Sequence, residues 1–187
     1  MELEHVMVVL PTLQTRKADT TMKELIQDAI NDQIRAEFDS AYTYLAMAAT
    51  MESKNLKGFG NWLRLQWQEE IGHAMRLYDF VLHRGGRIEL KSLAEPSFES
   101  DRPLTVFEQV LAMERENTAR IHGLYDLAVA EKDHALRSLL HWFIDEQVEE
   151  EDVANDIIEK LKLVGDSGPN LFLLDQEMGQ RSPESEA

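Results

Sequence analysis

The stretch "QWQEEIGHAMRL", residues 66–77, carries both the pattern of a buried helix and an interruption of that pattern. Apolar residues recur in and around it at the spacing of an amphipathic helix: Leu63, Trp67, Ala74, Leu77 and Val81. Glu70 falls on the same apolar face, and His73 lies one turn further along. This face is expected to contact a core, so the fold must account for a carboxylate placed inside that core.

Long helical patterns extend in both directions from this stretch, and no strand-like alternation of comparable length accompanies them. We expect four long helices, over residues 21–53, 59–84, 104–131 and 134–164. Thr21 and Glu24 are spaced as a capping box, and Gly85-Gly86 ends the second pattern. A long connection, residues 87–102, then joins two antiparallel hairpins. The sequence predicts an all-α four-helix bundle with one long crossover and a short fifth helix over about 170–179.

The chain divides into one folded domain and two flanking segments. We interpret residues 1–19 as an N-terminal extension, 20–180 as the bundle domain and 181–187 as a polar C-terminal tail. The apolar run at 6–10 is short and follows acidic residues, so we do not expect it to be a signal peptide. No segment is long and apolar enough to span a bilayer.

Composition and charge narrow the functional classes. The 187 residues include no cysteine, which excludes disulfides, thiolate zinc sites and cysteine-ligated iron–sulfur clusters. Asp and Glu outnumber Lys and Arg by 35 to 19, for a net charge of −16. This balance disfavours nucleic-acid and anionic-membrane partners and suits a protein that attracts cations, although acidity can serve solubility alone. We expect a cytoplasmic protein, since the absence of cysteine is compatible with that location.

Each of the four long helical stripes is apolar toward its ends and carries an acid near its middle. These acids are Glu37, Glu70, Glu114 and Glu150. A single acid on an apolar stripe can reach water or pair with an arginine. Four acids at matching depth, with no basic residue on the stripes, would be several kcal/mol too costly to bury uncompensated. Two divalent or trivalent metal ions would compensate them. A site rich in oxygen ligands with one imidazole suits iron.

The pattern around these acids resembles the ferroxidase site of ferritins. Its elements are Glu37, Glu70-x-x-His73, Glu114 and Gln147-x-x-Glu150. The segments "NDQIRAEFDSAYTYLAMA", "NWLRLQWQEEIGHAMRLYDF" and "WFIDEQVEEE" look like the motifs of non-haem bacterial and archaeal ferritins. The resemblance extends over about residues 22–178, which includes the short fifth helix. It is specific because several separate motifs match together.

The resemblance implies a di-iron centre with a ligand set divided between two positions. One iron would be bound by Glu37, Glu70 and His73. The second would be bound by Glu70, Glu114 and Glu150, with Gln147 nearby and Glu70 bridging the pair. Tyr44 matches the tyrosine that neighbours the iron centre in ferritins, where it can supply an electron.

Prokaryotic ferritins often have a third iron position beside the di-iron centre. Glu69, Glu146 and Glu149 match its ligands, and Glu150 is a candidate for sharing. The alternative interpretation of these residues is a solvated acidic face. Haem is not expected, because Ile71 stands where bacterioferritins carry their haem-ligating methionine and the fourth helix lacks their second Glu-x-x-His.

The function that the resemblance implies is iron storage with ferroxidase activity. Fe(II) would be oxidised by dioxygen or peroxide and stored as a ferric mineral inside a homo-oligomeric cage, expected to have twenty-four subunits. The fifth helix could contact another subunit or fold back on its own bundle through its apolar residues, Leu171, Phe172, Leu174 and Met178. Two alternatives remain: a di-iron oxygenase or peroxidase acting on an organic substrate, and a structural bundle whose acids bind only water.

Overall fold

The computed structural model describes residues 22–98, 101–165 and 168–182. Within these ranges the chain forms five α-helices and no strand. The helices are α1 Glu24–Ser53, α2 Lys57–His83, α3 Pro103–Ala130, α4 His134–Val164 and α5 Gly168–Met178. The interpreted extension, residues 1–19, lies outside the described residues, as does the tail beyond Ser182.

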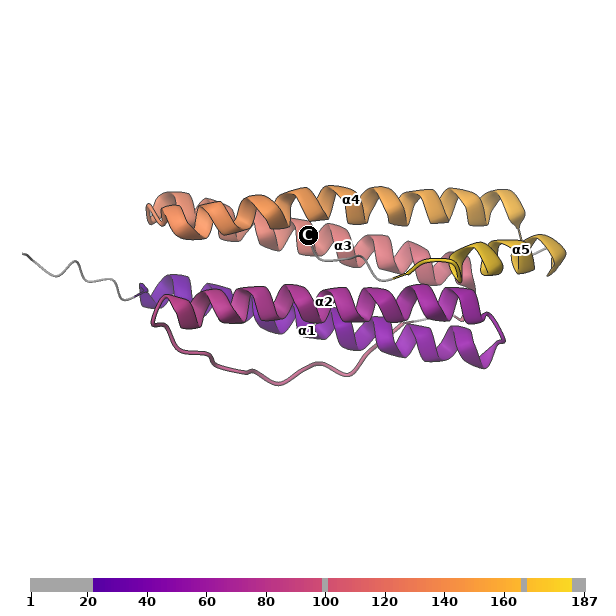
Figure 1. Cartoon of the computed structure of the whole chain (residues 1–187), viewed down its shortest axis with the longest axis horizontal. Helices are drawn as coiled ribbons and strands as arrows, with labels where there is room; N and C mark the ends of the chain where they lie inside the picture. The colour runs from indigo at the N-terminus through magenta and orange to yellow at the C-terminus, as the bar shows by residue number, and fades with distance from the viewer. Residues whose placement is uncertain (1–21, 99–100, 166–167, 183–187) are drawn as a thin grey trace, which may run out of the picture.

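The four long helices pack as two hairpins, α1 with α2 and α3 with α4, which lie side by side (Figure 1). The connection between α2 and α3 follows the outside of the bundle from one end to the other (Figure 1). At one end α5 packs against α2 and α4. The predicted all-α bundle with one long crossover and a short fifth helix is confirmed.

The helix ends follow local turn chemistry. Gly85 adopts a φ of +70°, and the N–H of Gly86 donates to the Val81 carbonyl at 2.9 Å, which ends α2. The carboxylate of Asp133 caps the start of α4. Both of its oxygens also accept hydrogen bonds from Arg84, at 2.8 and 3.0 Å, so the end of α2 is tied to the α3–α4 turn.

The start of α1 differs from its prediction. Lys23 occupies the N-cap position and makes no side-chain capping bond, and Glu24 is the first helical residue. The predicted capping box needs Glu24 three residues beyond the cap, so that prediction is wrong, and Thr21 itself lies outside the described residues. The ammonium of Lys23 instead contacts the Glu131 carboxylate at 2.8 Å, which ties the start of α1 to the end of α3.

Two apolar clusters fill the bundle on either side of a polar middle layer. The cluster toward α5 is built on Met51, Phe59, Phe107 and Leu161. The cluster toward the opposite end is built on Ile30, Leu77, Ile121 and Leu140. The predicted stripes, apolar toward their ends and acidic in the middle, thus assemble into three layers. The fold places the acids where water is excluded from above and below.

The fifth helix folds back on its own bundle through a specific polar contact. The buried carboxylate of Asp175 accepts hydrogen bonds from the backbone N–H groups of Gly58 and Phe59, at 2.8 and 3.0 Å. These N–H groups are unsatisfied donors at the start of α2. A Cβ built on Gly58 would lie 1.6 Å from the Asp175 carbonyl oxygen, so only glycine permits this approach.

The sequence left open whether the apolar residues of α5 contact their own bundle or another subunit. Some of them pack on the bundle, and others stay exposed. Leu174 and Met178 are buried against the bundle, and Leu171 is partly buried. Phe172 remains 58% exposed, as does its neighbour Leu173, at 62%. Among the described residues, no helix is both long and apolar enough to cross a membrane.

Candidate metal centre

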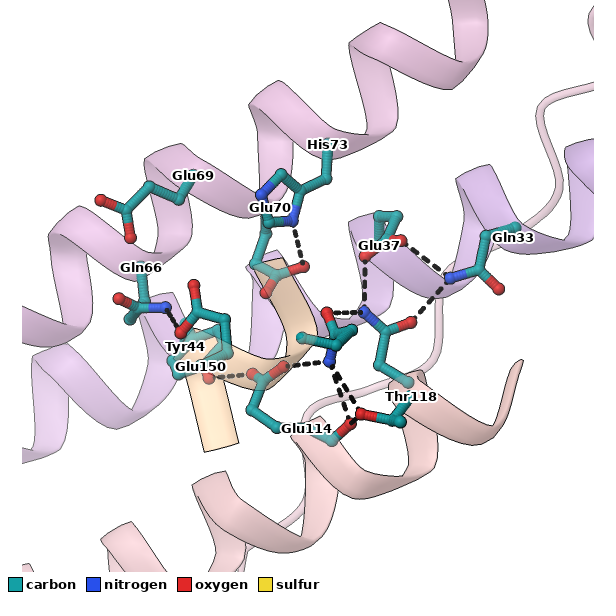
Figure 2. A network of polar contacts seen from close by, with 12 residues as sticks. Gln33, Glu37, Tyr44, Gln66, Glu69, Glu70, His73, Glu114, Thr118 and Glu150 are labelled. Carbon is teal, nitrogen blue, oxygen red and sulfur yellow. Dashed lines mark hydrogen bonds and ion pairs between the residues drawn. The ribbon is translucent and has the colours of Figure 1, made fainter. Parts of the chain in front are cut away.

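The polar middle layer brings together side chains from all four long helices (Figure 2). The buried members are Glu37 of α1, Glu70 and His73 of α2, Glu114 of α3 and Gln147 of α4. Tyr44 is also buried, and Glu150 is half-buried beside them. The sequence predicted this convergence from the matching depth of the acids on four separate stripes.

Glu37, Glu70 and His73 form the tightest group in the layer. Each offers one ligand atom, and these atoms all lie within 4.8 Å of one another. Glu70 Oε2 and His73 Nδ1 are buried without a hydrogen-bond partner among the described residues, and they lie 3.9 Å apart. Metal–ligand bonds of about 2 Å span such a gap. Two orphaned polar atoms that face each other in a dry core are the arrangement that a bound cation satisfies.

The imidazole of His73 is held by aromatic rings from α4. Its ring centroid lies 5.4 Å from that of Trp142 and 5.9 Å from that of Phe143, both in edge-to-face geometry. The guanidinium of Arg76 lies over the Trp142 ring, 3.8 Å from its centroid. These contacts limit rotation of the imidazole and shield it from water.

The buried carboxyl groups are electrostatically costly when ionised. Burial raises the pKa of Glu70 well above its ordinary value of 4.5, and the charges of Glu114 and Glu37 raise it further. Burial also raises the pKa of Glu114 to about 7, even though hydrogen bonds from Tyr44 and Gln147 lower it. The layer therefore favours neutral side chains unless positive charge enters.

Burial also shifts the pKa values of Glu150 and His73. Burial raises the pKa of Glu150 to about 8, with a further contribution from the charge of Glu114. Burial lowers the pKa of His73, which keeps the imidazole neutral and able to offer a lone pair to a cation. A divalent ion would stabilise the carboxylates and use the neutral imidazole as it stands.

Glu114 is surrounded by donors. The hydroxyl of Tyr44 donates to Glu114 Oε1. Burial raises the pKa of that hydroxyl well above 10, with the charge of Glu114 as the next cause, so Tyr44 remains protonated and acts as a donor. Gln147 Nε2 lies 3.3 Å from Glu114 Oε2 and 3.1 Å from its carbonyl oxygen. Gln147 is thus a donor to Glu114 within the polar layer.

Two residues that the sequence analysis missed hold Glu37 in place. Gln33 Nε2 donates to Glu37 Oε1 at 2.8 Å, and Asn117 Nδ2 donates to Glu37 Oε2 at 3.2 Å. Gln33 also donates to Asn117 Oδ1 at 2.6 Å, so the two amides support each other. Both are buried. Their signal was available: Gln33 lies four residues before Glu37, and Asn117 three after Glu114, each on the stripe of a centre residue.

The residues expected at a third iron position are more dispersed. Glu69 and Glu146 are half-buried, and Glu149 is exposed. Both oxygens of Glu69 accept hydrogen bonds from Arg181, at 3.1 and 2.8 Å. Within the described part of the chain, no second trio of His, Asp or Glu meets the spacing of the group at Glu37.

Fold and site together define a four-helix-bundle protein built around a buried, carboxylate-rich layer that contains a candidate metal-binding group. Residues 27–164 match the family model described as a ferritin-like domain. The chain belongs to the ferritin family, which confirms the resemblance seen in its sequence motifs.

Similar proteins include bacterial and archaeal ferritins. The bacterial non-heme ferritin of Bacteroides fragilis (strain 638R) is 40% identical over 160 residues, which cover 86% of this chain and 99% of the relative. That of Staphylococcus aureus (strain USA300) is 35% identical over 159 residues, 85% of this chain and 96% of the relative. The open pore ferritin of Archaeoglobus fulgidus is 48% identical, with a TM-score of 0.85 over 87% of this chain and 99% of that structure. An engineered closed form is 49% identical, with the same TM-score and coverage.

Proposed function

We propose that this protein is an iron-storage ferritin that oxidises Fe(II) at the polar middle layer. The orphaned pair, Glu70 Oε2 and His73 Nδ1, carries the proposal, because a structural bundle has no use for two unsatisfied polar atoms at its centre. The non-heme ferritin relatives, matched over nearly their full length, support iron as the ion. Oxygen ligands with one imidazole suit it chemically.

The ligands divide into two positions that share Glu70. Glu37 and His73 complete the first position, together with one oxygen of Glu70. Glu114 and Glu150 complete the second, with the other oxygen of Glu70 as a bridge. Gln33 and Asn117 orient Glu37 by hydrogen bonds, and such partners of ligands fix the ligand geometry.

The reaction that we propose consumes Fe(II) and dioxygen. Two Fe(II) ions each lose one electron, and dioxygen takes up these two electrons and two protons to leave as hydrogen peroxide. Anionic oxygen ligands favour the Fe(III) product because they stabilise the higher charge. Raised pKa values leave Glu150 largely protonated and Glu114 partly protonated at neutral pH, so iron binding releases protons from both. Peroxide is the alternative oxidant.

Tyr44 contacts one of the proposed iron ligands directly. Its hydroxyl donates to Glu114 from within the buried layer. A phenol in this position can supply its proton and one electron to dioxygen in place of the electron of one Fe(II), which leaves Tyr44 as a neutral phenoxyl radical. The high pKa of the phenol keeps that proton in place until an electron leaves.

Storage requires an enclosed space and a route from the centre to it. We propose that the subunits assemble into a homo-oligomeric cage, expected to have twenty-four copies, and that oxidised iron passes inward to form a ferric mineral. Glu69, Glu146 and Glu149 would accept iron next to the centre as a third position. The net charge of −16 per chain favours cation entry.

The decisive test is an isosteric change at the proposed bridge. Glu70→Gln keeps the shape of the side chain but removes its charge, so it should leave the bundle folded and slow Fe(II) oxidation by about a hundredfold or more. Stopped-flow absorbance after mixing anaerobic Fe(II)-loaded protein with air-saturated buffer measures this rate. Glu108→Gln, an exposed glutamate on α3, is the matched control and should oxidise iron at the wild-type rate. Equal rates for Glu70→Gln and wild type would refute the proposal.

A further inference from the structure

Residues 179–182, which follow α5, stay against the bundle and continue toward its middle (Figure 1). Arg181, which the sequence analysis assigned to the polar tail, is held by two contacts besides its ion pair with Glu69. Its carbonyl oxygen accepts a hydrogen bond from Asn61 Nδ2 at 3.2 Å. Its guanidinium lies 4.9 Å from the centroid of the Trp62 ring, a cation–π distance.

The guanidinium of Arg181 is engaged with Glu69 and Gln66 of α2. One nitrogen, Nη2, donates to both oxygens of Glu69, at 3.1 and 2.8 Å. The other, Nη1, donates to Gln66 Oε1. The Arg181 and Glu69 side chains are 22% and 23% exposed, so this ion pair is largely shielded from solvent. Arg181 is thus positioned by the fold and not merely resting on the surface.

Gln66 links Arg181 to Glu150 of the proposed metal centre. It is fully buried, and its Nε2 donates to Glu150 Oε2 at 2.9 Å (Figure 2). An arginine can only donate hydrogen bonds, so it faces the oxygen of an amide. The amide oxygen of Gln66 must therefore face Arg181 and its NH₂ group must face Glu150. The orientation of a buried amide at the centre is set by a residue from the C-terminal segment.

We propose that Arg181 is a resident counter-cation and positioning residue at the Glu69–Glu150 edge of the centre. Its guanidinium neutralises the negative charge of Glu69. Through its hydrogen bond to Gln66, it also orients Glu150 toward the second iron position. A metal ion can use Glu69 only when the guanidinium moves away. This inference rests on the proposed function, since it takes Glu150 to be an iron ligand.

The effect of Arg181 on metal binding follows from charge repulsion and from its contact with Gln66. A metal ion and a guanidinium repel each other, so they compete for the Glu69 carboxylate. With Arg181 in place, iron is confined to positions that Glu37, Glu70, His73, Glu114 and Glu150 provide. When Arg181 is displaced, Gln66 loses the contact that fixes its amide, and Glu150 can turn toward Glu69. The C-terminal segment therefore controls whether the centre holds two ions or more.

The test uses redox-inert Zn²⁺ on the full-length apo protein, by anaerobic calorimetry and by anomalous scattering from zinc-soaked crystals. Arg181→Gln should raise the zinc affinity at Glu69 by about fivefold, the upper range for a partly exposed ion pair. Zinc at Glu37, Glu70 and His73 should be unchanged. Arg181→Lys should remain near wild type at Glu69, since it keeps the charge. Arg64→Gln changes an exposed arginine on α2, the helix that carries Glu69; it removes the same charge and should leave zinc binding unchanged.

A second variant separates the relay from the ion pair. Gln66→Met leaves Arg181 and Glu69 paired, so it should weaken zinc at Glu150 without any gain at Glu69. A general loosening of the fold would instead change the occupancy of both positions in every variant. Unchanged zinc at Glu69 in Arg181→Gln, with wild-type zinc at Glu37, Glu70 and His73, overturns this inference alone. Wild-type protein with no zinc at those three residues overturns the proposed function and this inference with it.

Discussion

Buried acids are the residues that distinguish this bundle from an ordinary helical core. Glu70 and Glu114 lie in the polar layer between two apolar clusters, and burial raises the pKa of both. In the absence of a cation, each carboxyl group is more stable with its proton. The proposed iron ligands are therefore residues that lower the stability of the apo protein once they ionise.

Glu150 allows this cost to be measured as a function of pH. Its pKa is about 8 in the folded protein and near 4.5 in the unfolded chain. Below pH 4.5 both states hold the proton, and between 4.5 and 8 only the folded state does, so ionisation progressively favours unfolding. Relative to wild type in EDTA, Glu150→Gln should show little change in thermal midpoint at pH 4.5 and a rise of about 5 °C at pH 8.

The control for this experiment is Glu149→Gln, the exposed neighbour on α4. Its difference from wild type should be small and should not grow with pH in the same way. A Glu150→Gln advantage that stays constant from pH 4.5 to 8 would contradict the assignment of a proton to Glu150.

His73 is expected to act on one iron position only. His73→Ala removes the imidazole from the group with Glu37 and Glu70, while Glu114 and Glu150 keep their places. Zinc or iron occupancy at the first position should fall by about tenfold or more, and the second should be affected less. Anomalous difference maps from metal-soaked crystals resolve the two positions. Equal loss at both would argue against the division of ligands.

At the scale of helices, the docking of α5 is the contact that local pattern could not reveal. Asp175 satisfies two N–H groups at the start of α2, and Gly58 allows its backbone to come close. These partners are separated by 117 residues in the chain. Removing one carboxylate here affects both the start of α2 and the position of α5.

Asp175→Ala should lower the stability of the bundle by about 1–2 kcal/mol, as loss of a helix cap does. The N–H groups of Gly58 and Phe59 would remain buried without an acceptor. Thermal unfolding measures the loss, and amide hydrogen exchange should rise first in α5 and the first turn of α2. Gln176→Ala, an exposed change on the same helix, is the control. Unchanged exchange in α5 of Asp175→Ala would show that the cap does not hold the helix.

The helices and the polar layer were predictable because they depend on periodicity. The predicted bounds of α4 match, and those of α2 and α3 differ by one or two residues. Residues such as Glu37 and Glu70 stand out because an acid on an apolar stripe violates a regular pattern. The contacts of Asp175 and Arg181 were not predictable, because they join distant segments through side chains on otherwise polar surfaces. Gln33 and Asn117 lay between these cases, since a buried amide is less conspicuous than a buried acid.

At the scale of the molecule, the exposed apolar residues of α5 and the acidic charge bear on assembly. Phe172 and Leu173 remain exposed after α5 has folded onto its own bundle. Neighbouring copies of the chain would bury them in a closed assembly of identical subunits. The proposed cage thus assigns a role to apolar surface that the single subunit leaves uncovered.

The apo protein should therefore run as a large assembly. Twenty-four copies of a 21.5 kDa chain have a mass close to half a megadalton. Size-exclusion chromatography with light scattering measures the mass, and Phe172→Glu with Leu173→Glu should shift it toward smaller species. Glu177→Gln on the same helix should leave the mass unchanged. A monomer or dimer at micromolar concentration would favour a di-iron oxygenase over a storage protein.

The division of the centre between the two hairpins has a mechanical consequence. Glu37, Glu70 and His73 belong to the first hairpin, and Glu114 and Glu150 belong to the second. Iron held by both sets would join the two halves of a subunit across their seam. A subunit would then resist separation most strongly while it is loaded and would give up that reinforcement each time oxidised iron departs. The same iron-binding equilibrium would then determine both the turnover of iron and the resistance of the two hairpins to separation.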